Sequence, residues 1–179
     1  MNIKEDPTSL PPDQLKLGRS IQEPHSRKHY NVLFLCADNS ICSIMAEALL
    51  RRWGAEDFAA YSAGTTPNGA IHPLAVDLLK DRRVWCDDLR SKSCGEFLKA
   101  NSPNMDFVIS LGAQPPSGLP SAWPGDPQVI HWHITVPLIN GELSKVVRSF
   151  GRAFMELENR IRLFVLVYHK EALERAAAA

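Results

Sequence analysis

The chain has 179 residues, which is long enough for one domain with a full core and a tail. Hydrophobic residues make up 45% and charged residues 22%, a composition typical of globular proteins. Its 20 Lys and Arg residues balance 20 Asp and Glu residues, so the charge totals do not indicate a nucleic-acid or membrane-surface partner. No apolar run has the length of a membrane-spanning helix, and the N-terminal region lacks the apolar centre of a secretory signal. We therefore expect a cytoplasmic protein whose cysteines are reduced thiols.

Composition divides the chain into three parts. Residues 1–29 contain four prolines among mostly polar residues, and we expect a flexible N-terminal extension there. Residues 30–170 form the predicted domain. Residues 171–179, which end in four alanines, form a predicted C-terminal tail. The sequence gives no indication of the oligomeric state.

Short apolar segments alternate with segments of helical spacing along the domain. Strands are predicted at 31–35, 58–62, 106–111 and 129–133, and helices at 43–53, 72–80, 93–100 and 143–167. A loop rich in proline and glycine is predicted at 115–127. This alternation favours an α/β domain with a mostly parallel sheet. In such sheets, functional residues gather at the carboxyl ends of the strands.

The first of these strand ends carries a cysteine. Residues 35–43 read LCADNSICS and connect the predicted strand directly to a helix. A loop in this place can direct successive backbone N–H groups at an anion, assisted by the helix dipole, and the same groups would lower the pKa of Cys36. The spacing therefore indicates a nucleophilic cysteine facing an oxyanion pocket. The alternative, that Cys36 is a small buried apolar residue ending a strand, is equally compatible with the spacing.

Several motifs together resemble the low-molecular-weight tyrosine phosphatases and the arsenate reductases built on the same fold. The segment VLFLCADNSICSIMAEALL resembles their opening strand, phosphate loop and first helix. The other motifs follow in the same order: YSAG at 61–64, LRSKS at 89–93, DFV at 106–108, WPG at 123–125 and HW at 131–132. The resemblance covers about residues 30–168. It implies a three-layer α/β fold, with a four-stranded parallel sheet and helices on both faces.

The resemblance also implies roles for individual residues. In the family, a loop cysteine attacks phosphate or arsenate, an arginine six positions later clamps the oxyanion, and a distant aspartate protonates the leaving group. Cys36 is then the nucleophile, and Ser43 donates a hydrogen bond to its thiolate. Asn39 holds the loop in left-handed backbone angles, which asparagine tolerates. The implied anion-binding loop consists of Ala37, Asp38, Asn39, Ser40, Ile41 and Cys42.

The chain departs from the family pattern at two of these positions. Cys42 stands where the arginine makes charged bidentate hydrogen bonds, and a thiol is a weak, uncharged donor. Val136, before Pro137, stands where the aspartate donates a proton. Asp38 also places a carboxylate within the loop. We expect a weakly active or non-catalytic homologue that acts by binding or by thiol redox chemistry; the alternative is an active arsenate reductase or phosphatase with a rearranged anion site.

Other residues are candidates to compensate for these losses. Arg90 and Lys92 offer positive charge, and His131 and His133, on one side of a strand, offer a proton near neutral pH. The alternative interpretations are a solvated basic turn and structural histidines. Asp126, before Pro127, imitates the acid-before-proline pair but is interpreted as a solvated turn residue.

Three interpretations of the two loop cysteines are open. In the first, which we prefer, Cys42 fills the space of the lost arginine. In the second, Cys36 and Cys42 form a redox pair, and in the third they bind Cu(I) or Zn²⁺ with a further ligand. We predict no cofactor and no metal site. The expected partner is a weakly bound phosphate- or arsenate-like anion or a protein, and neither nucleic acid nor membrane.

Overall fold

The computed structural model describes residues 29–85 and 87–177, with side chains as far as Lys170. The predicted N-terminal extension therefore lies outside the described residues, except for His29. Four strands form one parallel sheet: β1 (Tyr30–Cys36), β2 (Phe58–Gly64), β3 (Phe107–Gly112) and β4 (Gln128–His133). The predicted α/β class and the four parallel strands are confirmed.

The helices are α1 (Cys42–Trp53), α2 (Pro73–Asp81) and α3 (Leu143–Ala177), together with the short 3-10 helix η1 (Cys94–Leu98). The prediction was wrong about the end of α3, which continues through most of the region that we expected to be a tail. The residues after the predicted end include Lys, Glu, Leu and Ala, which have high helix propensity and extend the last helix. No helix in the described ranges combines the length and the hydropathy that a membrane span requires.

The strand order in the sheet is β2-β1-β3-β4, so the chain leaves β1 in one direction and returns to its other side. Strand β1 is therefore the switch point of the sheet, and the crevice beyond its carboxyl end is the usual ligand site of an open α/β sheet. The loop that starts at Cys36 lies at this place. Cys36 is aligned with Gly64 of β2, and Leu35 with Ser110 of β3.

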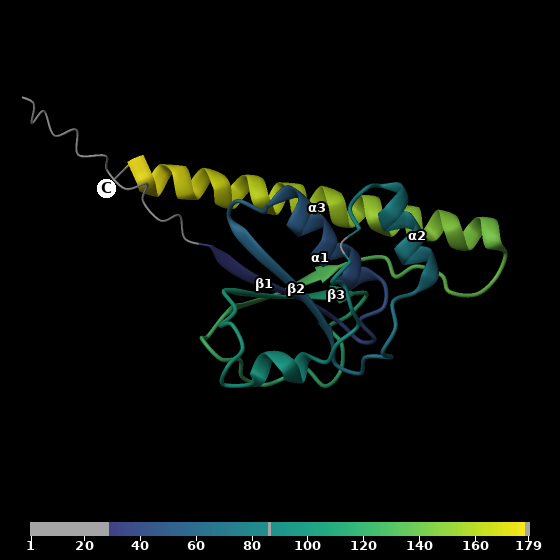
Figure 1. The fold of residues 1–179 in the computed structure, drawn as a ribbon, viewed down its shortest axis with the longest axis horizontal. Coiled ribbons are helices and arrows are strands. Elements are labelled where there is room, and N and C mark those ends of the chain that lie inside the picture. The colour runs from purple at the N-terminus through teal and green to yellow at the C-terminus, as the bar shows by residue number, and fades with distance from the viewer. Residues whose placement is uncertain (1–28, 86, 178–179) are drawn as a thin grey trace, which may run out of the picture.

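The sheet separates two apolar cores of unequal size. Helices α1, α2 and α3 lie on one side of it and η1 lies on the other (Figure 1). The larger core joins α1 and α3 to side chains such as Val32 and Phe34 of β1. The smaller one joins Leu33 and Leu35 to Phe97 of η1. The predicted helices on both faces are present, although among the described residues one face carries a single short helix and loops.

Gly64 allows the loop after β1 to lie close to β2. A Cβ atom at this position would be 2.7 Å from the carbonyl oxygen of Ala37 and 3.0 Å from the backbone nitrogen of Asn39. Beyond Gly64, the N–H of Thr65 donates to the carbonyl of Cys36 at 3.1 Å, and that of Thr66 donates to Ala37 at 2.8 Å. The end of β2 thus fixes the first half of the loop.

Candidate anion-binding loop

The loop after β1 has the backbone features of an anion cradle. Cys36 ends a buried strand, and α1 begins six residues later at Cys42. No side chain caps the N-terminus of α1, and its first turn holds no acidic residue. Asn39 has a φ of 49°, in the left-handed region expected for it. The backbone N–H groups at this helix terminus are therefore directed toward the loop mouth.

Asn39 ties three segments of the chain together. Its Nδ2 donates to Ser43 Oγ at 2.8 Å and to Ser62 Oγ at 3.0 Å. Its Oδ1 accepts a hydrogen bond from the backbone N–H of Lys92 at 2.7 Å. The side-chain amide thus holds the loop, β2 and the segment before η1 in one arrangement.

These contacts belong to a chain of hydrogen bonds with a fixed direction. The carboxylate of Glu47 can only accept, so Ser62 Oγ donates to it, at 2.5 Å. Ser62 in turn accepts from Asn39, which also donates to Ser43. The hydroxyl hydrogen of Ser43 is then left to donate to Cys36 Sγ, 2.9 Å away. The network places Ser43 in the donor role that stabilises a thiolate.

The pKa of Cys36 is nevertheless raised above its ordinary value. Burial is the largest cause, since Cys36 is only 8% exposed, and the charge of Asp38 adds to it. Hydrogen bonds from Ser43 and from the backbone N–H of Asn39, 3.1 Å from the sulfur, lower the pKa but do not offset the burial. The lowered pKa expected from the loop geometry is therefore wrong. The helix dipole and the backbone amides favour the thiolate, but burial of the sulfur and the neighbouring carboxylate of Asp38 oppose it more strongly.

The thiol of Cys42 is also held in its protonated form. Burial raises its pKa to about 12, and negative charge at Cys36, Asp38 and Glu156 contributes. Thiol–disulfide exchange requires a thiolate, so these surroundings disfavour the redox-pair interpretation. Within the part of the chain that the structure describes, no three His, Cys, Asp or Glu side chains gather in a metal-binding arrangement.

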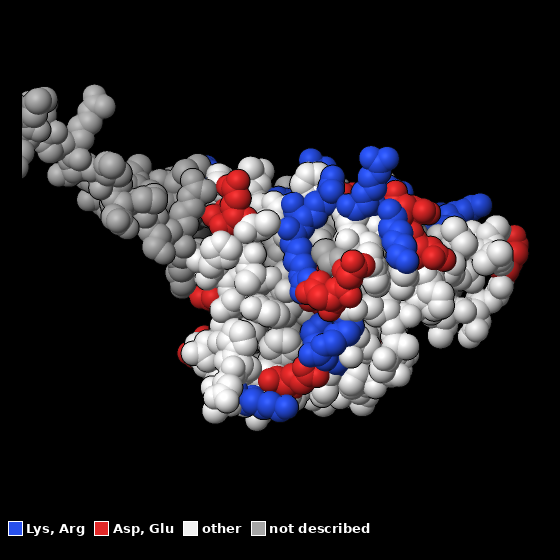
Figure 2. Space-filling model, in the orientation of Figure 1, with Lys and Arg blue, Asp and Glu red and all other residues white. Residues whose placement is uncertain are grey.

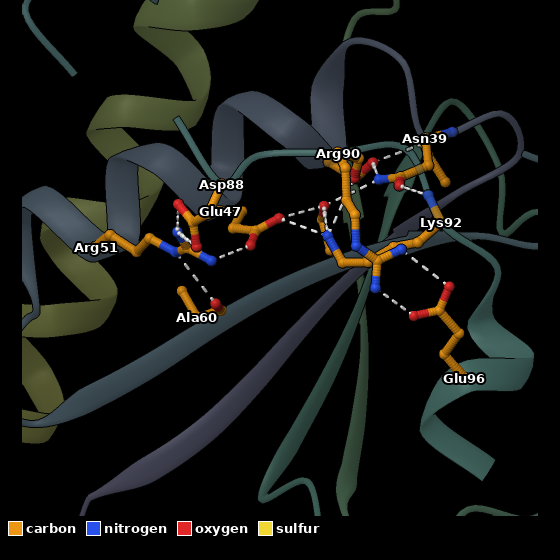
Figure 3. A network of polar contacts seen from close by, with 11 residues as sticks. Asn39, Glu47, Arg51, Ala60, Asp88, Arg90, Lys92 and Glu96 are labelled. Carbon is orange, nitrogen blue, oxygen red and sulfur yellow. Dashed lines mark hydrogen bonds and ion pairs between the residues drawn. The ribbon is translucent and has the colours of Figure 1, made fainter. Parts of the chain in front are cut away.

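The two candidate cations carry carboxylate partners of their own (Figure 3). Arg90 is exposed and makes a two-fold contact with Glu96, at 3.0 and 2.5 Å. Lys92 is buried, with its Nζ 3.2 Å from Glu47 and 3.1 Å from the carbonyl of Arg90. The solvated-turn interpretation thus holds for Arg90 and is wrong for Lys92. Basic and acidic side chains also alternate over the face of the molecule seen in Figure 2.

The candidate histidines lie on a different side of the sheet from Cys36. His131 and His133 are exposed on β4, and they alternate with Trp132, which packs in the larger core. Side chains two residues apart on a strand point to the same face, so Cys36 shares the face of Phe34, which lies in the larger core. The two histidines therefore project from the opposite face. His131 Nδ1 lies 3.0 Å from Ser110 Oγ, as a structural histidine would. Neither histidine is placed to protonate a group bound at Cys36.

The two positions considered for the general acid are both exposed. Val136 is 56% exposed in the segment after β4. Asp126 is exposed, with a φ of 52°, and its N–H donates to Trp123 in a turn. This agrees with the solvated-turn interpretation of Asp126.

Two carboxylates near the loop were missed by the sequence analysis. Glu156 of α3 accepts a hydrogen bond from the N–H of Thr135 at 3.2 Å, and its charge acts on Cys42. Nothing in the sequence connects residues so far apart. Glu47, by contrast, follows Ser43 by one helical turn on the buried side of α1, and a charged residue at such a position was a signal of a buried partner.

We expect Cys36 to react slowly with iodoacetamide at neutral pH and faster as the pH rises. Its raised pKa lowers the fraction of thiolate at neutral pH, and the thiolate is the reactive form. Ser43→Ala removes a donor and should move the profile to still higher pH. Mass spectrometry of the Cys36 peptide over a pH series would measure this, with Cys36→Ser as the blank. A reaction faster than that of free cysteine at neutral pH would contradict it.

The fold and this loop define a class of protein, an α/β domain with a cysteine at the mouth of a strand–loop–helix anion cradle. The sequence pattern of the family described as "Low molecular weight phosphotyrosine protein phosphatase" matches residues 31–176. The match covers most of the chain, and the protein belongs to this family.

Within the family, the similar relatives are arsenate reductases. The chain is 29% identical to an arsenate reductase of Bacillus cereus (strain AH187) over 134 residues, which are 74% of this chain and 92% of the relative. It is 28% identical to a glutaredoxin arsenate reductase of Synechocystis sp. over 131 residues, 73% of this chain and 95% of the relative. The arsenate-reductase-like branch expected from the motifs is confirmed.

Solved structures of arsenate reductases share the fold. One in the phosphate-binding state has a TM-score of 0.61 at 23% identity, covering 76% of this chain and 97% of its own. The arsenate reductase of Archaeoglobus fulgidus has a TM-score of 0.58 at 24% identity, covering 75% of this chain and 98% of its own. At this identity the likeness shows the architecture only.

Proposed function

We propose that this protein is a family member with little or no phosphatase or arsenate reductase turnover, which acts by binding. One observation supports this most directly: the charge around Cys36 is negative. Cys42 offers a protonated thiol where the family carries a guanidinium, and a carboxylate oxygen of Asp38 lies 3.6 Å from Cys36 Sγ. The carboxylate of Asp38 would repel a tetrahedral dianion at this place, and no guanidinium would bind it.

The expected losses in reaction rate support the same conclusion. Loss of one positioned oxyanion donor lowers the rate by about 10²–10³-fold. Loss of a general acid, as at Val136, lowers it by about 10²–10⁴-fold. The two factors need not multiply, because parts of one catalytic unit are not additive. Either loss alone, added to a nucleophile with a raised pKa, is enough to suppress turnover.

A second candidate is an active enzyme with a rearranged anion site. The intact contacts among Cys36, Asn39 and Ser43 favour it, because they keep the sulfur positioned at an uncapped helix terminus. The names of the relatives favour arsenate as the substrate in this case. This candidate requires a cation at the loop from a bound partner.

Two assays separate the candidates. We expect the wild-type chain to match Cys36→Ser both in hydrolysis of p-nitrophenyl phosphate and in arsenate reduction with glutathione, glutaredoxin or thioredoxin. An active arsenate reductase serves as the positive control. Turnover that depends on Cys36 in either assay would favour the second candidate and refute the proposal.

A further inference from the structure

The side chain of Asp38 lies over the nucleophilic sulfur. Its Oδ1 is 3.6 Å from Cys36 Sγ and also accepts the backbone N–H of Ser40 at 3.3 Å. Its Oδ2 accepts from Ser40 Oγ at 2.6 Å. The carboxylate therefore takes up two donors of the loop and faces the atom that an oxyanion would approach.

We propose that Asp38 is an internal ligand of the loop, which occupies the place of an oxyanion and keeps phosphate and arsenate out. This inference rests on the proposed function, because it names what fills the loop in place of a substrate. A carboxylate is a suitable substitute, since it accepts the same N–H and O–H hydrogen bonds as a phosphate oxygen.

The backbone around Asp38 is fixed by other parts of the chain. The carbonyl of Asp38 accepts from the N–H of Asn68 at 3.2 Å and from Ser91 Oγ at 3.4 Å. The next residue, Asn39, is held in its left-handed conformation by three side-chain contacts. Asp38 is half-buried, and its backbone is held by contacts with the segment after β2 and with the segment before η1.

Nearby cations do not neutralise this carboxylate. Across the described side chains, no Lys or Arg forms an ion pair with Asp38. Arg51 pairs with Glu47 and Asp88, while the charges of Arg90 and Lys92 are balanced as described above. An incoming dianion would have to displace a like charge with no compensating cation, and like charges at this range repel strongly in a partly buried site.

A simpler explanation of the Asp38–Ser40 contacts is a local turn that shapes the loop. Asparagine forms such turns as well as aspartate does, because its side-chain oxygen accepts the same N–H. Asp38→Asn therefore keeps the turn and removes the charge, whereas Asp38→Ala removes both. The internal-ligand proposal predicts that charge is the property that excludes anions.

The test is calorimetric titration of the full chain with inorganic phosphate and with arsenate. We expect Asp38→Asn to bind at least about tenfold more tightly than wild type, as removal of one close like charge implies. Asp126→Asn is the matched control, because it makes the same change at an exposed turn residue, and it should bind as wild type does. Circular dichroism and thermal unfolding establish that each variant is folded.

A second pair keeps the test decisive if the single variants bind too weakly to measure. Cys42→Arg is compared with Cys42→Arg/Asp38→Asn, in which an arginine supplies affinity to both. Equal affinities within this pair, or a wild-type chain that binds as tightly as Asp38→Asn, would overturn the internal-ligand proposal.

Turnover assays on the same variants separate this inference from the proposed function. Tighter binding by Asp38→Asn without turnover supports both. Tighter binding together with Cys36-dependent turnover supports the internal ligand and refutes the proposed function, because Cys42 and Val136 would then not be limiting.

Discussion

The double variant Cys42→Arg/Val136→Asp is expected to hydrolyse p-nitrophenyl phosphate about 10³-fold faster than the wild-type chain, or more. The estimate lies within the range given by one restored oxyanion donor and one restored general acid, without assuming that their effects multiply. Cys42 is the first residue of α1, and Val136 precedes Pro137, the position that the resemblance assigns to the acid. A guanidinium beside Cys36 should also lower the pKa of that thiol.

The matched control is Cys42→Met/Val136→Asn, which has long or polar side chains at the same positions but neither the cation nor the acid. It should stay at the wild-type rate. Adding Cys36→Ser to the restored variant should abolish the gain. Initial rates across substrate concentration, with thermal unfolding as a check on folding, measure the effect. Equal rates for the restored variant and its control would mean that the loop is disabled by something other than these two losses.

Glu47→Gln is expected to lower the free energy of unfolding by about 3–5 kcal/mol, the range for breaking a buried ion pair by removing one partner. The amide keeps the shape of the side chain but leaves the ammonium of Lys92 without a countercharge. Lys92 is 8% exposed, and burial already lowers its pKa. Its other contacts are to Ser62 Oγ and to the carbonyl of Arg90, which are uncharged.

Lys92→Met should cost much less than Glu47→Gln, because Arg51 remains 2.5 Å from the carboxylate of Glu47. The double variant Glu47→Gln/Lys92→Met should recover a large part of the loss, since it leaves no unpaired ammonium. Urea unfolding of the four proteins in the cycle gives the coupling energy. A larger loss for Lys92→Met than for Glu47→Gln would show that Arg51 does not balance the carboxylate.

The internal pair also has a consequence for the loop. Glu47 accepts from Ser62 Oγ, which accepts from the amide of Asn39, and the same amide donates to Ser43, the neighbour of Cys36 Sγ. An uncharged amide at position 47 is both donor and acceptor, so it no longer requires Ser62 Oγ to be the donor in their contact. The buried carboxylate of Glu47 thus joins the ion pair with Lys92 to the hydrogen bonds that hold Asn39 of the loop (Figure 3).

Local sequence determined the elements of this protein and the place of its loop. Apolar runs of strand length and helical spacing on 43–53 and 143–167 report short-range backbone preferences, and they predicted the four strands, α1 and most of α3. The ordered motifs identified the family, and the places of Cys42 and Val136 relative to these motifs predict two departures from its pattern. These inferences needed no knowledge of which segments touch.

Tertiary structure decided the electrostatics of the site. The pKa of Cys36 depends on burial beneath packed elements and on the direction of one carboxylate, and both are absent from a local pattern. Lys92 forms an ion pair with Glu47 of α1, and the charge of Glu156 on α3 raises the pKa of Cys42. Desolvation and charge–charge interaction act through space, so the chain order that predicts strands and helices cannot predict them.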